Sequence, residues 1–184
     1  PGFEGVTVRD RSDDYAQIAV QGPRALEVTQ KLTPVPLGEI KYYRFVEGEI
    51  NGVKAILART GYTGEDGFEV YVAPPAAAPL WRALLAAGAD AGIAPTGLGA
   101  RDTLRFEACM PLYGNDIDDT TTPYDAGLDW IVKLDKGAFL GRDLLARQRE
   151  QGITRKLVGF EVKGRGIARH GYPIVSGGAE VGVV

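Results

Sequence analysis

The chain has 184 residues, a formal net charge of -3, and hydrophobic and charged fractions of 45% and 24%. These values are typical of a globular protein with one or two domains, and the lack of a basic stripe with interleaved aromatic residues argues against binding to nucleic acid or to an anionic membrane. Cys109 is the single cysteine, so an intrachain disulfide and a cysteine-built zinc site are excluded.

The first third of the chain alternates between strand-like and helix-like segments. Residues 15–20 predict a strand, and residues 24–32, which follow a Gly-Pro turn, predict a helix. Two further strand-like runs, 40–49 and 53–59, are joined by Asn51-Gly52. That dipeptide favours a two-residue turn, so we expect a β-hairpin here.

A glycine-rich segment follows, with glycines at positions 61, 64 and 67. This spacing predicts a shaped loop in which the backbone takes positive φ or packs closely against something. Residues 68–72 then alternate in hydropathy, which predicts a strand. Phe68, Val70 and Val72 would share one face of it, and Glu69 and Tyr71 the other.

The remaining segments are shorter and richer in structure-breaking residues. The pattern predicts a helix over 74–89, a helix with Thr96 as its N-cap to about residue 108, a strand over 128–134 and a helix over 141–151. From residue 156 onward the pattern becomes strand-like with glycine turns, over 157–162, over 171–175 and from 181. This change indicates a second, all-β unit of which the chain holds the first strands.

Glu69 is a candidate ligand contact because Gly67 brings backbone close to it and Tyr62 and Tyr71 flank it. A carboxylate in this setting can accept two parallel N–H donors from a planar heterocycle, whereas the alternative is a solvated strand face. Glu65 and Asp66, at the tip of the loop, are expected to face water or to cap local N–H groups.

Arg101 lies at helical spacing from the apolar residues of its segment, which predicts an inward guanidinium that needs a partner. That partner is either a ligand with a carboxylate or carbonyl edge, or an acidic residue in a structural salt bridge. The acidic candidates are Glu69, Asp102 and Glu107.

Other polar residues point away from metal or triad chemistry. His170 is the only histidine, so neither a catalytic triad nor a histidine-built metal site is expected. The acidic run 115–119 lacks the glycine and terminal glutamate of an EF-hand loop, and turn or cap chemistry explains it better. We expect Cys109 to serve packing.

Three long motifs occur in one order: RTGYTGEDGFE at 59–69, GLGARDTLR at 97–105 and LYGNDID at 112–118. Together they resemble the aminomethyltransferase (T-protein) family of the glycine cleavage system, and further matching residues at 122–123, 127–130 and 136–142 extend the resemblance over essentially the whole chain. The resemblance implies an α+β fold of antiparallel sheets with packed helices. Residues 1–150 would belong to the folate-binding domain, and residues 151–184 would begin a C-terminal β-barrel, cut short.

Members of this family take the aminomethyl group from the lipoyl arm of the H-protein, pass its one-carbon unit to tetrahydrofolate, and release ammonia with 5,10-methylenetetrahydrofolate. The resemblance makes Glu69, Arg101, Tyr62 and Tyr42 folate-binding residues. It implies no metal, and it implies a location in the bacterial cytoplasm or the mitochondrial matrix.

Two related classes are the alternatives to this assignment. One is the folate domain of a demethylase or of a dimethylglycine or sarcosine oxidising enzyme. The other is a noncatalytic folate-binding relative that assists iron–sulfur cluster assembly, whose Lys-Gly-Cys-Tyr motif is replaced here by Lys136-Gly137-Ala138-Phe139. A plain interaction module leaves the glycine-rich loop and Arg101 unexplained.

The resemblance also places the family's catalytic aspartate before Pro1, so no catalytic residue is assigned in this chain. The start without Met and the end within an alternating run predict an internal fragment. We therefore expect the isolated chain to give no turnover with lipoylated H-protein and tetrahydrofolate in an assay of methylenetetrahydrofolate formation. Measurable product would contradict this expectation.

Overall fold

The computed structural model describes residues 5–184, which form two compact units. The first unit ends at Pro111, and the second is Leu112–Val184. The expected domain boundary at residue 150 stays a prediction. Among residues 5–184 no helix is long and apolar enough to cross a membrane.

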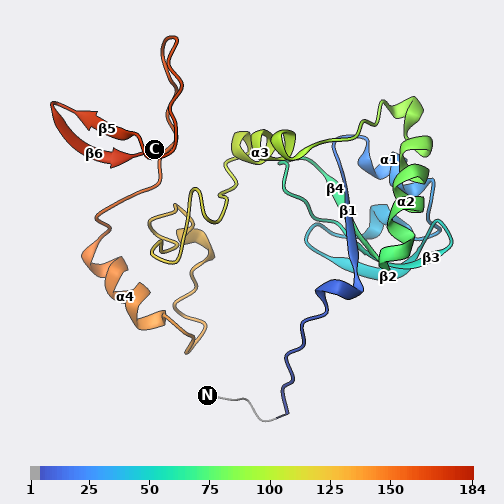
Figure 1. The fold of residues 1–184 in the computed structure, drawn as a ribbon. Helices are drawn as coiled ribbons and strands as arrows, with labels where there is room; N and C mark the ends of the chain where they lie inside the picture. The colour runs from blue at the N-terminus through green and yellow to red at the C-terminus, as the bar shows by residue number, and fades with distance from the viewer. Residues whose placement is uncertain (1–4) are drawn as a thin grey trace. The chain divides into compact units, whose positions relative to one another are not determined.

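A four-stranded antiparallel sheet is the centre of the first unit (Figure 1). Its spatial order is β1-β4-β3-β2, with every neighbouring pair antiparallel. The strands are β1 (Ala16–Gln21), β2 (Phe45–Ile50), β3 (Val53–Ala58) and β4 (Gly67–Val72). The predicted α+β class with antiparallel strands is confirmed.

The core lies on one face of this sheet, under helices α1 (Ala25–Gln30) and α2 (Pro74–Ala87), which both cover that face (Figure 1). Leu80 and Leu84 of α2 pack against the apolar side chains of the strands. The predicted alternation in β4 is confirmed: its buried apolar residues are Phe68, Val70 and Val72, while Glu69 and Tyr71 are half-buried on the opposite face.

The predicted hairpin joins β2 to β3 at Asn51 and Gly52, whose φ angles are 51° and 74°. Both residues thus take the left-handed conformation that a type I′ turn requires and that Asn-Gly favours. Residues 40–44 stay outside the strand, because the chain there forms a turn held by hydrogen bonds to Arg59, described below.

The first unit also contains shorter helical segments. In the first unit these are the short 3-10 helices Ser12–Asp14, Leu37–Glu39 and Ala89–Ala91, and helix α3 (Leu98–Glu107). The helix expected from Thr96 begins after Gly97 instead, because the Thr96 hydroxyl donates to the carbonyl of Ala94 rather than to the helix start.

The second unit contains α4 (Arg142–Gln151), close to its predicted bounds, and an antiparallel pair formed by β5 (Pro173–Ser176) and β6 (Ala179–Val183). This pair agrees with the expected opening strands of a β-barrel. The predictions of strands over 128–134 and 157–162 are wrong. Residues Asp129–Ile131 form a 3-10 turn, because the backbone there bonds locally instead of to a neighbouring strand.

Asp125 is a buried carboxylate that organises the second unit. Its carboxylate accepts hydrogen bonds from the Thr122 backbone at 3.0 Å, from Gln148 at 3.1 Å and from Arg155 at 3.4 Å. Burial by itself raises the pKa of Asp125, but the hydrogen bonds with Thr122 and the interaction with Arg155 outweigh it and lower that pKa. One carboxylate thereby connects a loop, α4 and the segment beyond it.

Replacing a fully buried core residue tests the description of the sheet. Leu57 of β3 is 0% exposed, so Leu57→Ala is expected to lower the free energy of unfolding by about 2–5 kcal/mol. The matched control is Leu98→Ala, since Leu98 is 82% exposed and its truncation is expected to cost about 0.5 kcal/mol or less. Urea denaturation followed by circular dichroism measures both. Equal losses in the two variants would contradict the assignment of the core.

Candidate functional site

The loop of residues 59–67, which joins β3 to β4 and includes Gly67 at the start of β4, wraps around the side chain of Gln21 at the end of β1. The Gln21 amide donates to the Thr60 carbonyl at 3.0 Å and accepts from the Thr63 hydroxyl at 3.1 Å. A Cβ at Gly67 would lie 2.5 Å from Cδ of Gln21, and a Cβ at Gly61 would also collide with that amide. The expectation of close backbone packing is confirmed at both glycines.

Gly64 serves the loop differently, because it has a φ of 78°. A Cβ at Gly64 would also lie 2.7 Å from Cβ of Ala108, just beyond the end of α3. Glycine at this position therefore permits the left-handed backbone and lets the loop lie against the end of the helix.

Arg59 and Asp66 close the base of the loop with a two-point ion pair, with N–O distances of 2.9 and 2.7 Å. The sequence predicts that Asp66 faces water or caps a local N–H group. The Asp66 carboxylate is partly exposed and interacts with the Gly67 N–H, and it also forms the ion pair, which was not predicted. The hydrogen bonds from Arg59 lower the pKa of the Asp66 carboxyl. Arg59 also donates to the carbonyl of Ile40 at 3.0 Å, which ties the preceding turn to the loop.

Glu69 lies on the polar face of β4 and is half-buried. Gln17 of β1 donates to Oε1 of Glu69 at 2.5 Å, and the hydroxyl of Thr60 donates to Oε2. Its cross-strand neighbours are Ala19 on β1 and Ala58 on β3. The carboxylate is therefore held on both oxygens, and the residue directly opposite it on each adjacent strand carries only a methyl group.

Tyr62 joins the loop to α3. Its hydroxyl donates to the carbonyl of Pro111 at 2.6 Å, and the guanidinium carbon of Arg101 lies 4.9 Å from the centroid of its ring. This distance is within the range of a cation–π contact. Tyr62 and Arg101 therefore form one cluster, and Arg101 is held with its guanidinium over an aromatic face.

The prediction that Arg101 points inward is wrong, because Arg101 is exposed and Arg105 is the buried arginine of α3, at 4% exposure. Arg105 pairs with Asp102 at 2.7 Å and donates to the carbonyl of Met110 at 3.2 Å. The two arginines lie about one turn apart, so a small rotation of the helix relative to the predicted face exchanges them. Asp102, a candidate partner of Arg101, is thus bound to Arg105.

Tyr42 stands in the turn before β2, where its ring centroid lies 4.3 Å from that of Tyr43. Burial, followed by a hydrogen bond with Tyr43, raises the pKa of the Tyr42 hydroxyl. Tyr43 has a φ of 61° and donates its backbone N–H to the carbonyl of Arg59 at 2.9 Å. The turn that carries Tyr42 is thus attached to the first residue of the loop.

All four predicted site residues depend on this one loop. Glu69 bonds to Thr60, Tyr62 belongs to the loop, Arg101 contacts Tyr62, and the turn of Tyr42 bonds to Arg59. No role was predicted from the sequence for three residues that support this arrangement, namely Gln17, Gln21 and Thr60, and the ion pair of Asp66 was not predicted either. The glycine spacing was a usable signal for Gln21, since it implied that some group lies against the backbone.

A shallow surface groove of the first unit lies away from this loop. It has a volume of about 570 Å³ and is lined by Leu26, Glu27, Gln30, Lys31 and Gly38. None of the four predicted residues contributes to it. Three of its lining residues, Leu26, Glu27 and Gln30, belong to α1, and no glycine-shaped loop contributes to it, so we take the loop as the stronger candidate site.

The remaining polar candidates have local roles in the structure. Asp116 accepts from the Leu112 backbone at 2.8 Å, and Asp118 accepts from Thr120 and Thr121 in a compact turn. Turn chemistry, as expected, accounts for these two carboxylates. Cys109 is exposed and has a φ of 57°, so the expectation that it serves packing is wrong for the described chain.

Comparisons with known proteins agree on one family. The family model described as the GCVT N-terminal domain matches residues 2–136. An aminomethyltransferase of Halothermothrix orenii is 51% identical over 96% of this chain and 50% of its own length. An aminomethyltransferase of Moorella thermoacetica is 52% identical over 100% of this chain and 50% of its own length.

A solved structure gives the same result for the fold. The glycine cleavage system aminomethyltransferase T from Bartonella henselae matches with a TM-score of 0.80 and 34% sequence identity. The match covers 92% of this chain and 46% of that protein. The chain therefore spans about half the length of the relatives that it matches.

The ion pair at the base of the loop can be tested by titration. The pKa of Asp66 is expected to lie below its ordinary value of about 3.9, because Arg59 stabilises the ionised form. A lowered folded-state pKa stabilises the fold above the unfolded-state pKa, and this stabilisation is lost as the pH falls through the folded-state value. Carboxyl ¹³C NMR titration should show the Asp66 pKa rising in Arg59→Gln.

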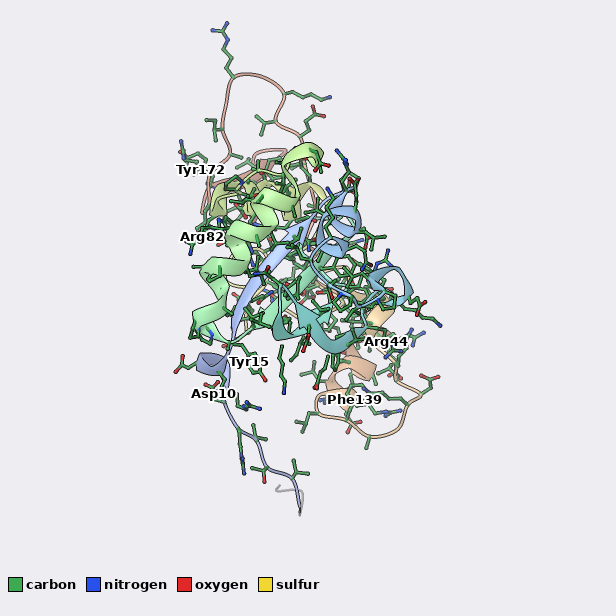
Figure 2. The ribbon with its side chains drawn as sticks, turned by 90° about the vertical axis from the view of Figure 1, so that its right-hand side faces the viewer. Asp10, Tyr15, Arg44, Arg82, Phe139 and Tyr172 are labelled. Carbon is green, nitrogen blue, oxygen red and sulfur yellow. The ribbon has the colours of Figure 1, made fainter. Side chains whose placement is uncertain are left out.

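The control variant is Arg44→Gln, because Arg44 is an exposed arginine of the neighbouring turn, at the edge of the first unit in Figure 2. Arg44→Gln is expected to leave the Asp66 pKa unchanged. An Asp66 pKa that responds equally to both variants would show that net charge, rather than the two-point ion pair, sets it.

Proposed function

Because the chain belongs to the aminomethyltransferase family, with a GCVT N-terminal domain over residues 2–136, we propose that it forms the folate-binding part of a glycine cleavage system aminomethyltransferase. The proposed reaction moves the one-carbon unit of an aminomethyl group, carried on the lipoyl sulfur of the H-protein, to tetrahydrofolate. Ammonia leaves, the lipoyl arm is released as its dithiol, and the folate becomes 5,10-methylenetetrahydrofolate.

One observation carries this proposal: four side chains of suitable chemistry are attached to a single loop. The Glu69 carboxylate, held on both oxygens, can accept N–H donors from the pterin edge of a folate. Arg101, placed over the ring of Tyr62, offers a planar fork to a carboxylate or a carbonyl edge. Tyr62 and Tyr42 supply aromatic surface beside these charges.

The chemical role proposed for this chain is to bind and orient the folate amine that attacks. Holding the acceptor in one orientation lowers the entropic part of the barrier to group transfer. No side chain of residues 5–184 is assigned the proton transfers of the reaction. The H-protein is the proposed partner and tetrahydrofolate the one-carbon acceptor, with no metal. The proposed location is the cytoplasm, because the matched relatives are bacterial.

The alternatives are less well supported. A folate-dependent demethylase or oxidase would use a similar folate site, but the matched relatives described above are named aminomethyltransferases. The iron–sulfur assembly relative would carry a cysteine in the segment where this chain has Ala138. No structural feature of residues 5–184 specifically favours the demethylase or oxidase, or the iron–sulfur assembly relative.

Folate binding by site variants tests the proposal. In the full-length protein that contains these 184 residues, Glu69→Ala and Arg101→Ala are each expected to raise the Kd for tetrahydrofolate about 10- to 100-fold. The reason is that each variant removes a charge-assisted hydrogen bond of about 1.5–3 kcal/mol. Anaerobic isothermal titration calorimetry measures the Kd.

Matched controls come from exposed residues of the same type. Glu65 lies at the tip of the loop, and Arg82 lies on the outer side of α2 in Figure 2. Glu65→Ala and Arg82→Ala are expected to change the Kd by about twofold or less. Unchanged binding in both Glu69→Ala and Arg101→Ala would show that the folate binds elsewhere.

A further inference from the structure

We propose that Gln17 and Thr60 are positioning residues, which fix the carboxylate plane of Glu69 so that it presents one free acceptor site on each oxygen to the ligand. This inference rests on the proposed function, since it concerns how the folate-binding carboxylate is held. Neither residue belongs to the set of four assigned from the sequence.

The argument starts from the acceptor capacity of a carboxylate. Each oxygen of Glu69 can accept about two hydrogen bonds. Gln17 occupies one site on Oε1 at 2.5 Å, and the Thr60 hydroxyl occupies one site on Oε2. One site therefore remains on each oxygen, and this pair of sites matches a ligand edge that carries two adjacent N–H donors.

The sheet register explains how both donors reach Glu69 without covering it. Ala19 and Ala58 stand directly opposite Glu69 on the two adjacent strands. Gln17 precedes Ala19 by two residues and Thr60 follows Ala58 by two, so both lie diagonally from Glu69 on the same face. The donors therefore approach from opposite ends of the carboxylate, and the positions beside it carry only methyl groups.

Thr60 is itself held in place by β1. The Gln21 side-chain amide donates to the Thr60 carbonyl at 3.0 Å, and the same amide lies against Gly61 and Gly67. The backbone that carries the Thr60 hydroxyl is therefore held in position by close packing against Gln21. Strand β1 therefore positions both donors to Glu69. Gln17 of β1 is itself one donor, and Gln21 of β1 holds Thr60, which is the other.

The consequence for binding is preorganisation. A glutamate side chain that is free to rotate loses rotamer freedom when a ligand fixes it, and that loss weakens binding. Two donors that fix the carboxylate beforehand remove this loss. A bidentate ligand edge then meets both acceptor sites at once.

The test uses the full-length protein that contains these 184 residues, with tetrahydrofolate as the probe and isothermal titration calorimetry to measure the Kd. Thr60→Val keeps the shape and removes the donor, and Gln17→Met does the same on the other side. Each is expected to raise the Kd about 5- to 20-fold, within the effect of one hydrogen bond to a charged group. Thr60→Ser keeps the hydroxyl and is expected to restore binding to within about threefold of the parent chain. The control Thr7→Val, at an exposed threonine, is expected to leave the Kd unchanged.

A double-mutant cycle separates positioning from general stability. If Thr60 acts through Glu69, Thr60→Val added to Glu69→Ala is expected to raise the Kd no further than Glu69→Ala alone. Additive losses would overturn the inference, as would a failure of Thr60→Ser to restore binding. If circular dichroism shows that the Thr60→Val chain is unfolded, the same cycle is measured with Gln17→Met in place of Thr60→Val.

The two proposals fail in different ways. If Glu69→Ala binds tetrahydrofolate as the parent chain does, the proposed folate site is wrong. If Glu69→Ala loses binding while Thr60→Val and Gln17→Met do not, the folate site stands and the positioning inference is overturned.

Discussion

The close approach of the Gln21 side chain to the backbone of Gly61 and Gly67 is the constraint on which the site depends. Because Gly61 and Gly67 have no side chain, the Gln21 amide fits against their backbone, and it forms hydrogen bonds with Thr60 and Thr63 of the loop. The loop is therefore shaped by packing as well as by hydrogen bonds. This contact acts together with the Arg59–Asp66 ion pair and the Thr60–Glu69 hydrogen bond to fix Thr60 relative to Glu69.

The sheet provides two environments from one alternating pattern. Its apolar face closes on α1 and α2 and holds the unit together, while the other face carries Glu69 among short and polar neighbours. Because side chains alternate along a strand, the same residues of β4 that build the core also fix where the carboxylate emerges. The core and the proposed ligand site thereby lie on opposite faces of the sheet.

Local patterns were sufficient to predict much of this fold. The Asn51-Gly52 turn and the alternation from Phe68 to Val72 depend on neighbours in sequence, and both are confirmed. Long-range contacts were not predictable in this way. Thr63 donates a hydrogen bond to Gln21, which is 42 residues away in sequence, and neither local pattern indicates the partner. The exchange of Arg101 for Arg105 as the inward arginine has a similar cause, because helical spacing fixes a face only to within a fraction of a turn.

The dependence of four side chains on one loop has a dynamic consequence. Loops open locally at a lower free energy than the core, so under the proposed function the fraction of molecules with residues 59–67 closed would set the fraction able to bind folate. An opening of this loop would separate Thr60 from Glu69 and carry Tyr62 away from Arg101 in the same event. Apparent affinity would then scale with the closed population, which makes the stability of a nine-residue segment a direct determinant of ligand occupancy.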